Sequence, residues 1–360
     1  MKILFIITGL RYGGAEKLLY LTCKYLTSAY GADIRVIYFD PYAPMQPFFI
    51  ELGIKTELVP RNLALLPRLF KRLREGHYDI VHTHLIHADI YGRLAALLMG
   101  KRQNYTIFTT VHDVDWFRWQ RGWYFALVRT IDTWLSQSKR CRVIAISKAV
   151  KEMLIERQNY EGEKITILYN AIEIDANPSP HLPTQTIKCL YLGRLVKKKN
   201  IPCLLQAIAR LKSHDLMLTI VGEGEEEKFL QELVVQLDLQ DKVRFFPATW
   251  EVESYYRESD LFILPSTYEG LGIVILEAFS HALTVIGSDV HGISELLADD
   301  RGILFPNNDV QALADGIEEL IRNPQRRIYY GRRGYAYVKS NHDIRDYARM
   351  LYQLYGGSEK

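Results

Sequence analysis

The chain has 360 residues, of which 48% are apolar and 24% are charged, and its formal net charge is +3. At about 100–200 residues per domain, this length predicts two domains, and the abundant aromatic residues exclude a disordered chain. No apolar stretch reaches the ~18–20 uninterrupted residues that a spanning helix needs, so a membrane-spanning protein is excluded as well.

Short runs rich in Ile, Val and Leu recur through the first half of the chain. The expected strands are Lys2–Ile7, Asp33–Phe39, Lys55–Pro60, Asp79–His84, Tyr105–His112, Arg142–Ser147 and Ile165–Asn170. Helical stretches such as Ala15–Tyr30 and Ile90–Met99 lie between them. Because apolar and polar residues do not alternate within the strands, we expect a parallel sheet covered on both faces.

A proline-rich segment, Ala171–Thr186, interrupts this rhythm and is typical of a linker. Beyond it the expected strands are Ile187–Gly193, Leu216–Gly222, Val243–Pro247, Leu261–Pro265, Thr284–Ser288 and Gly302–Phe305. The expected helices are Ile201–Lys212, Glu225–Leu237, Ile273–His281, Val310–Arg322 and an amphipathic tail, Asp343–Tyr355. The pattern predicts an α/β protein of two Rossmann-like βαβ domains. Ligands of such sheets bind beyond the carboxyl ends of the strands, so a cleft between the two domains is the expected active site.

Cysteine usage and charge distribution indicate the cellular compartment and the kind of partner that the protein is expected to have. The four cysteines are scattered without a Cys-x-x-Cys pair, and the apolar start Met1–Gly9 is followed by no signal-peptide cleavage site; both fit a reducing cytoplasm. Residues 1–170 hold 24 Lys and Arg against 15 Asp and Glu, whereas the remainder holds 21 against 27. The basic half is expected to face an anionic partner, a membrane surface or nucleic acid. No basic–aromatic RNA motif or helix-turn-helix favours nucleic acid.

The first expected strand runs into the glycine-containing segment Gly9–Glu16, which includes Gly13 and Gly14. Glycines there allow a ligand to approach the backbone, and the following helix offers free N–H groups. The spacing is neither the dinucleotide fingerprint nor a Walker loop. A plain turn and a ligand loop are therefore equally open.

Two segments in the second half combine charge with a position after a strand. Gly193–Asn200 holds four cations in six residues, including Arg194 and Lys199, which could neutralise a diphosphate; a solvated charge run is the alternative. In Ser266–Ala278, Glu269 leads a glycine turn into a helix that contains Glu277. A carboxylate within so apolar a helix is costly unless it binds something, and the amides of the turn could bind an anion. The alternative is an exposed Glu277.

Four histidines, His82, His84, His87 and His112, follow strands of the first half, and Asp113 and Asp115 follow the last of them. Histidines with carboxylates can bind a metal. We expect His82 and His84 to point to opposite faces of their strand, which argues against a shared metal. A hydrogen-bonding histidine at the cleft is favoured, with a structural histidine as the alternative.

Together these segments resemble the GT4 family of retaining glycosyltransferases, which have the GT-B fold. The matching segments are Gly13–Glu16, Asp79–His84, Val111–Asp113, Ile146–Ser147, Tyr169–Ala171, Gly193–Arg194, Lys199–Asn200, Val221–Gly224, the Glu-x7-Glu pair Glu269 and Glu277, and Glu295. The sequence departs from the family where Ala282 and Thr284 replace the usual Gly and Pro, where His291–Gly292 replaces Gly-Gly, and at Ala171, where Gly is frequent. These departures leave the donor sugar open.

The resemblance implies a division of roles. Arg194 and Lys199 would hold the donor diphosphate, Glu277 the ribose and Glu269 the sugar hydroxyls, with His112 beside the reacting centre. The implied catalytic residues are His112, Glu269, Arg194 and Lys199, and the implied donor-binding residues are Gly13, Gly14, Arg194, Lys199, Gly222, Glu269, Gly270, Leu271, Gly272 and Glu277. The family needs no metal or other cofactor beyond the nucleotide-sugar co-substrate, and the acceptor attacks on the face from which the diphosphate leaves.

The resemblance also implies domains and an activity. Residues 1–175 with 340–360 would form the acceptor domain, onto which the tail helix packs back, and residues 186–339 the nucleotide-sugar domain. The expected activity is transfer of a sugar, from a UDP-sugar, to a lipid-linked or growing glycan acceptor in cell-surface polysaccharide or glycolipid synthesis. A catalytically silent sugar-nucleotide-binding partner and a sugar-nucleotide epimerase of the same fold remain alternatives.

Aromatic and basic residues cluster in the first half. Residues 116–140 include Trp116, Trp119, Trp123 and Trp134 with five Arg or Lys and one Asp, and Arg61–Gly76 has the same charge balance among interleaved leucines. Such a mixture is typical of an interfacial helix and predicts reversible docking on an anionic membrane. The alternative is that Trp119, Trp123 and Trp134 face the core.

Overall fold

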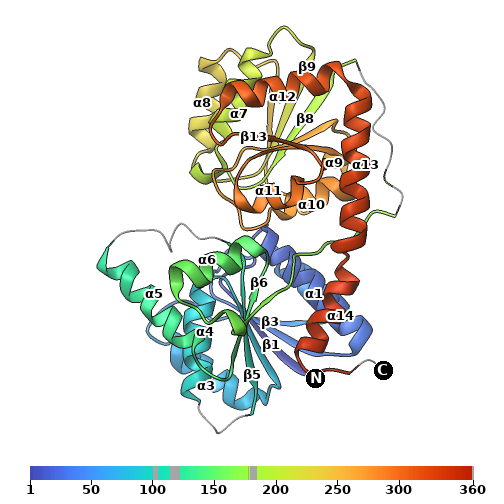
Figure 1. Cartoon of the computed structure of the whole chain (residues 1–360). Helices are drawn as coiled ribbons and strands as arrows, with labels where there is room; N and C mark the ends of the chain where they lie inside the picture. The colour runs from blue at the N-terminus through green and yellow to red at the C-terminus, as the bar shows by residue number, and fades with distance from the viewer. Residues whose placement is uncertain (100–103, 114–121, 177, 179–184, 359–360) are drawn as a thin grey trace. The chain divides into compact units, whose positions relative to one another are not determined.

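The computed structural model describes residues 1–99, 104–113, 122–176, 178 and 185–358 (Figure 1). Its contacts divide into two compact units, Met1–Asn170 with Ile344–Lys360, and Ala171–Asp343. The second unit thus begins where the linker was expected, and Ile172 forms a parallel bridge to Asp343 at the junction. Within the expected linker, residues 177 and 179–184 lie outside the described residues.

The first unit is a seven-stranded sheet in the order β3-β2-β1-β4-β5-β6-β7, with every pairing parallel. Its strands are β1 Lys2–Ile7, β2 Asp33–Tyr38, β3 Lys55–Leu58, β4 Ile80–His84, β5 Thr106–Val111, β6 Cys141–Ala145 and β7 Ile165–Ile167. Its helices are α1 Gly14–Tyr30, α2 Gln46–Glu51, α3 Leu65–Gly76, α4 Ile86–Leu98, α5 Trp123–Ser136, α6 Lys148–Gln158, the short 3-10 turn η3 Gly162–Lys164, and α14 Ile344–Leu354.

The second unit is a six-stranded parallel sheet in the order β10-β9-β8-β11-β12-β13. Its strands are β8 Ile187–Leu192, β9 Leu216–Val221, β10 Val243–Phe246, β11 Leu261–Leu264, β12 Thr284–Ser288 and β13 Ile303–Phe305. Its helices are the 3-10 turn η4 Lys197–Lys199, α7 Ile201–Arg210, α8 Glu227–Gln236, α9 Glu253–Arg257, α10 Ile273–Ser280, α11 His291–Leu297, α12 Val310–Arg322 and α13 Pro324–Asn341. Both expected parallel sheets are confirmed, and so is each expected strand, with one to three residues fewer at some ends and with β6 beginning one residue earlier than expected.

Helix α13 has no counterpart among the expected helices, because its surface is rich in Arg and Tyr and carries no long apolar stripe. Its packing face is made by glycines instead. A Cβ at Gly331 would lie 2.0 Å from the carbonyl oxygen of Ala282, and one at Gly334 would lie 2.2 Å from the ring of Phe279. The helix therefore approaches α10 and the following turn more closely than a side chain would allow.

The tail helix α14 packs on α1, as expected. The rings of Tyr30 and Tyr352 stack at 4.2 Å, and Tyr355 reaches the sheet, where its ring lies edge-on to Phe108 at 4.9 Å. The last turn of the chain is thereby attached to the middle of the first sheet. None of the described helices combines the length and the apolar character that crossing a bilayer requires.

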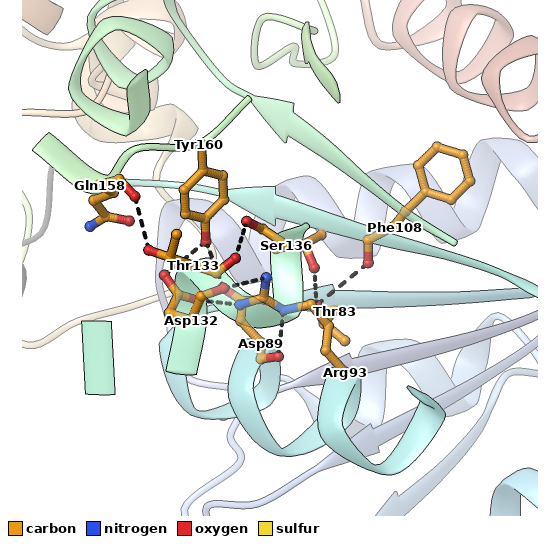
Figure 2. A network of polar contacts seen from close by, with 10 residues as sticks. Thr83, Asp89, Arg93, Phe108, Asp132, Thr133, Ser136, Gln158 and Tyr160 are labelled. Carbon is orange, nitrogen blue, oxygen red and sulfur yellow. Dashed lines mark hydrogen bonds and ion pairs between the residues drawn. The ribbon is translucent and has the colours of Figure 1, made fainter. Parts of the chain in front are cut away.

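A buried ion pair joins α4 to α5 (Figure 2). The guanidinium of Arg93 is fully buried; it donates to the carbonyl oxygen of Asp89 at 2.7 Å and pairs with the carboxylate of Asp132. The hydroxyl of Tyr160 donates to the other carboxylate oxygen of Asp132 at 2.8 Å. Since both charges are satisfied away from water, the network fixes α5 on the unit through its inner face.

Candidate functional site

In the second unit, the loops after β8 and β9 lie in direct backbone contact at the carboxyl end of the sheet. The N–H of Leu195 donates to the carbonyl of Glu223 at 2.8 Å. A Cβ at Gly222 would lie 2.0 Å from the carbonyl oxygen of Gly193, and one at Gly224 would lie 2.2 Å from that of Leu195. Both positions require glycine, which explains the Val221–Gly224 segment in terms of loop packing.

A buried ion pair joins the β8 loop to the β11 loop. Lys199, on η4, places its Nζ 2.7 Å from Oε2 of Glu269, and the side chains are only 9% and 14% exposed. Burial raises the pKa of the Glu269 carboxyl, but the charges of Lys199 and Lys198 outweigh it, so the pKa lies below its ordinary value. The backbone supports the pair, because the N–H of Thr267 donates to the carbonyl of Lys198 at 2.8 Å.

Glu277 lies in α10 and is 6% exposed, so the alternative of an exposed helix residue is wrong. The hydroxyl of Tyr256, on α9, donates to its Oε2 at 2.8 Å. Burial and the adjacent carboxylate raise the pKa of Tyr256, which keeps this hydroxyl protonated. The ring of Tyr256 stacks on His281 at 5.5 Å. Tyr256 is the residue that sequence reasoning missed, since it stands 21 positions before Glu277 in a polar segment.

The turn between the two glutamates is shaped by glycine. Gly272 adopts a left-handed conformation with φ 81° directly before α10. A Cβ at Gly292, in α11, would lie 2.5 Å from the carbonyl oxygen of Glu269. The expected donor-binding residue Leu271 is 1% exposed, so its side chain belongs to the core and it can offer a ligand only its backbone. Arg194 is exposed, and the loop that carries it is held by a 3.0 Å hydrogen bond from Tyr191 to its carbonyl.

In the first unit, histidines gather at the carboxyl ends of β4 and β5. The rings of His82 and His84 stack at 4.3 Å, so the expectation that they point to opposite faces is wrong: residues two apart in a strand share a face. His84 Nδ1 lies 2.9 Å from Nε2 of His112. Both ring nitrogens of His82 form hydrogen bonds, Nδ1 with the hydroxyl of Tyr355 and Nε2 with the hydroxyl of Thr110 at 2.8 Å.

These histidines are electrically neutral at physiological pH. Burial lowers the pKa of His82 and His84 well below 6.5 and that of His112 to about 3. Asp115 lies outside the described residues. Within the part of the chain that the structure describes, no group of histidine, cysteine or acidic side chains is arranged to hold a metal ion.

Gly13 and Gly14 lie where the β1 loop enters α1, and Gly13 is extended with φ −158°. A Cβ at Gly13 would lie 2.4 Å from Oε2 of Glu16. The same loop is held to the β2 loop by the ion pair of Arg11 and Asp40 at 2.7 Å. Because β1 lies between β2 and β4 in the sheet, this loop borders the histidine cluster.

Two departures from the family pattern have visible consequences. Ala282, where the family has Gly, adopts φ +54°, a conformation that strains an alanine. Thr284, where the family has Pro, donates its hydroxyl to the carbonyl of Arg327 in α13. The turn after α10 is thus built by a hydrogen bond rather than by Gly and Pro.

The basic and aromatic segments of the first unit differ from each other in their exposure. On α5, Trp123 is 80% exposed, Leu127 50% and Trp134 61%, so the alternative that these tryptophans face the core is wrong for both. Trp116 and Trp119 lie outside the described residues. In α3 the leucines instead pack into the core, and its exposed surface carries basic residues such as Arg68 and Lys71.

Comparison with known proteins identifies both halves of the chain. A family model described as Glycosyltransferase Family 4 matches residues 12–176, and one described as Glycosyl transferases group 1 matches residues 174–337. An uncharacterized glycosyltransferase of Haemophilus influenzae is 32% identical over 210 residues, which cover 55% of this chain and 57% of that protein. The chain therefore matches little more than half the length of such relatives.

A longer match, 27% identical over 294 residues, covers 76% of this chain and 74% of the Escherichia coli UDP-Gal:alpha-D-GlcNAc-diphosphoundecaprenol alpha-1,3-galactosyltransferase. Among solved structures, Anabaena HepE in complex with UDP and glucose superposes with a TM-score of 0.87 at 21% identity, covering 99% of this chain and 100% of that one. The fold is therefore that of GT-B glycosyltransferases.

Proposed function

Because the chain belongs to glycosyltransferase family 4, we propose that it is a retaining, metal-independent glycosyltransferase that moves a sugar from a UDP-sugar to a lipid-linked or growing glycan acceptor in cell-surface polysaccharide or glycolipid synthesis. The observation that carries the proposal is the buried pair of Lys199 and Glu269 in the second unit. A buried ion pair stabilises a fold poorly, whereas a lysine in the loop that follows a strand of such a sheet is suited to a phosphate.

In the proposed reaction an acceptor oxygen bonds to the anomeric carbon as the bond from that carbon to the diphosphate oxygen breaks. The departing phosphate oxygen takes the acceptor proton, so no protein nucleophile is needed. Lys199 and Arg194 stabilise the negative charge that develops on this oxygen, which is the dominant form of enzymatic stabilisation. Glu269 holds sugar hydroxyls, and Glu277, oriented by Tyr256, holds the ribose.

The donor base and the acceptor are supported by what the relatives are said to use. HepE was solved with UDP, and the name of the E. coli relative specifies UDP-Gal and a diphosphoundecaprenol-linked acceptor. The test is calorimetric titration with UDP, GDP, ADP and TDP. UDP is expected to bind most tightly; preference for another nucleotide would refute the donor assignment.

Matched variants separate specific binding from general charge. Arg194→Ala and Lys199→Ala are each expected to weaken UDP binding by about 10–150-fold, because a charge-assisted contact contributes about 1.5–3 kcal/mol. Lys212→Ala is the control, since Lys212 pairs with Asp238 on the surface of the same unit. Unchanged affinity in both site variants would refute the assignment.

We further propose that the first unit docks reversibly on the cytoplasmic face of an anionic membrane through α5. Trp123, Leu127 and Trp134 lie on one face of the helix, opposite the ion pair that anchors it. Asp132 is the only acidic residue of α5, and its charge is neutralised within that ion pair. Exposed aromatic residues on a unit with excess positive charge are suited to an anionic interface.

Liposome flotation tests this proposal. The wild-type chain is expected to float with anionic vesicles at low salt and to be released by high salt. The double variant Trp123→Ser, Trp134→Ser should stay in the lower fractions, whereas Phe229→Ser, which removes a 48% exposed aromatic from α8, should float like wild type. Equal flotation on neutral and anionic vesicles, or none on either, would indicate a soluble acceptor instead.

A further inference from the structure

The contact between His84 and His112 constrains the protons of both rings. His84 closes β4 and is paired in register with Thr110, so its ring lies beside the residue that follows β5. The two ring nitrogens, Nδ1 of His84 and Nε2 of His112, are 2.9 Å apart, and the ring centroids are 5.2 Å apart. At this distance one nitrogen must donate a hydrogen to the other.

The second nitrogen of His84 decides which one donates. His84 is 2% exposed, and its Nε2 is buried with no hydrogen-bond partner among the described residues. A neutral imidazole carries one N–H, and a buried N–H without an acceptor is rarer and costlier than an unused lone pair. The hydrogen of His84 therefore sits on Nδ1, which donates to His112.

The surrounding groups favour two neutral rings. His82 stacks on His84 and is itself hydrogen-bonded to Thr110 and Tyr355. Among the described residues, the His84 ring forms a hydrogen bond only with His112. Burial, with the neighbouring rings of His82 and His112, lowers the pKa of His84. His112, whose Nε2 accepts from His84, must then carry its own hydrogen on Nδ1.

We propose that His84 is a positioning residue that fixes His112 in its Nδ1–H form, so that the ring of His112 offers a hydrogen-bond donor to an oxygen of a substrate bound at the carboxyl edge of the first sheet. This role rests on the proposed function, because it takes His112 to lie beside the reacting centre. His84 touches no substrate and acts through His112 alone. A histidine in the wrong tautomer can retain its place and lose its activity.

The first test reads the tautomer directly and needs no substrate. Two-bond 1H–15N correlation spectra of the full chain labelled at histidine distinguish Nδ1–H from Nε2–H, and the His112 signal is assigned by its loss in His112→Gln. The Nδ1–H form is expected in the wild type. In His84→Asp the carboxylate can only accept, so His112 should change to an Nε2–H donor. An Nε2–H form in the wild type, or no change in His84→Asp, would overturn the proposal.

The second test is kinetic and uses a conservative rescue. His84→Asn keeps an N–H donor near the position of Nδ1 and should retain kcat within about threefold, whereas His84→Leu should lower kcat by about tenfold or more with little change in KM. His77→Asn, at the exposed end of α3, is the matched control. Wild-type kcat in His84→Leu would overturn the positioning role. If no variant, wild type included, transfers sugar, the proposed function fails while the tautomer measurement still stands.

Discussion

Removing the charge of Lys199 tests the candidate donor site most sharply. In Lys199→Met a chain of similar length replaces the lysine, and the carboxylate of Glu269 remains in a site that is only 14% exposed. Breaking a buried pair by deleting one partner costs about 3–5 kcal/mol, because the other charge is left uncompensated. This is a large share of the roughly 5–15 kcal/mol by which domains are stable.

The double variant Lys199→Met, Glu269→Gln separates stability from binding. With both charges gone, most of the lost free energy of unfolding should return, since a neutral pair is often as stable as a buried ion pair. UDP affinity should stay low, because the diphosphate still lacks its cation. Lys197→Met, on the same turn but exposed, should change stability by less than about 0.5 kcal/mol.

Urea unfolding and calorimetric titration with UDP provide the two measurements. Stability that recovers together with UDP affinity would show that Lys199 only supports Glu269 and does not bind the donor. A loss well below about 1 kcal/mol in Lys199→Met would show that water reaches the pair, and the reasoning from burial would then be wrong.

Three further predictions concern the frame around the site. Asp132→Ala should lower the free energy of unfolding by about 3–5 kcal/mol by leaving the Arg93 guanidinium buried and unpaired, and Arg93→Met, Asp132→Leu should recover most of that loss in urea titrations. Ala282→Gly should raise the thermal midpoint of unfolding, because it relieves about 1–2 kcal/mol of left-handed backbone strain. The added conformational entropy of the unfolded chain costs less, roughly 0.4–1 kcal/mol. An unchanged or lower midpoint would contradict the strain. Because the pKa values of His82 and His84 are depressed in the folded state, the unfolded chain binds protons at a higher pH than the folded chain does. The free energy of unfolding should therefore fall as pH drops below 6.5, by about 1.4 kcal/mol per pH unit for each fully depressed group. The Glu269 carboxyl, whose pKa is lowered, loses its contribution only below its ordinary value of 4.5, so urea titrations at pH 7, 5.5 and 4 separate the two effects.

The sheets were predictable because buried parallel strands are continuous apolar runs, a signal that survives without any knowledge of the neighbours. Helix α13 could not be predicted in this way. Its packing relies on Gly331 and Gly334, and a glycine contributes no side chain to an apolar pattern. The faces of β4 could have been predicted correctly: the period of two places His82 and His84 on one face.

The residues of the candidate site likewise fall into those that the sequence could predict and those that it could not. The residues after each strand were identifiable from position and charge, as with Lys199 and Glu269. Their partners were not, because the contact of Tyr256 with Glu277 or of His84 with His112 depends on helix placement and strand register. The exposure of Trp123 and Trp134 was equally hidden, since a helix with two apolar faces does not reveal which one is buried.

The loops of the second unit that carry the proposed donor site are held in place by contacts within the fold. Close glycine contacts lock the β8 and β9 loops together, and the pair with Glu269 holds Lys199 in place and largely out of water. Side-chain ordering and desolvation are among the main costs of binding, and here folding has already met them. If Lys199 binds the donor diphosphate as proposed, the ligand gains a positioned cation at little further entropic cost. On this reasoning the buried pair is retained less for stability than for preorganisation, because an apolar pair would serve the fold equally well.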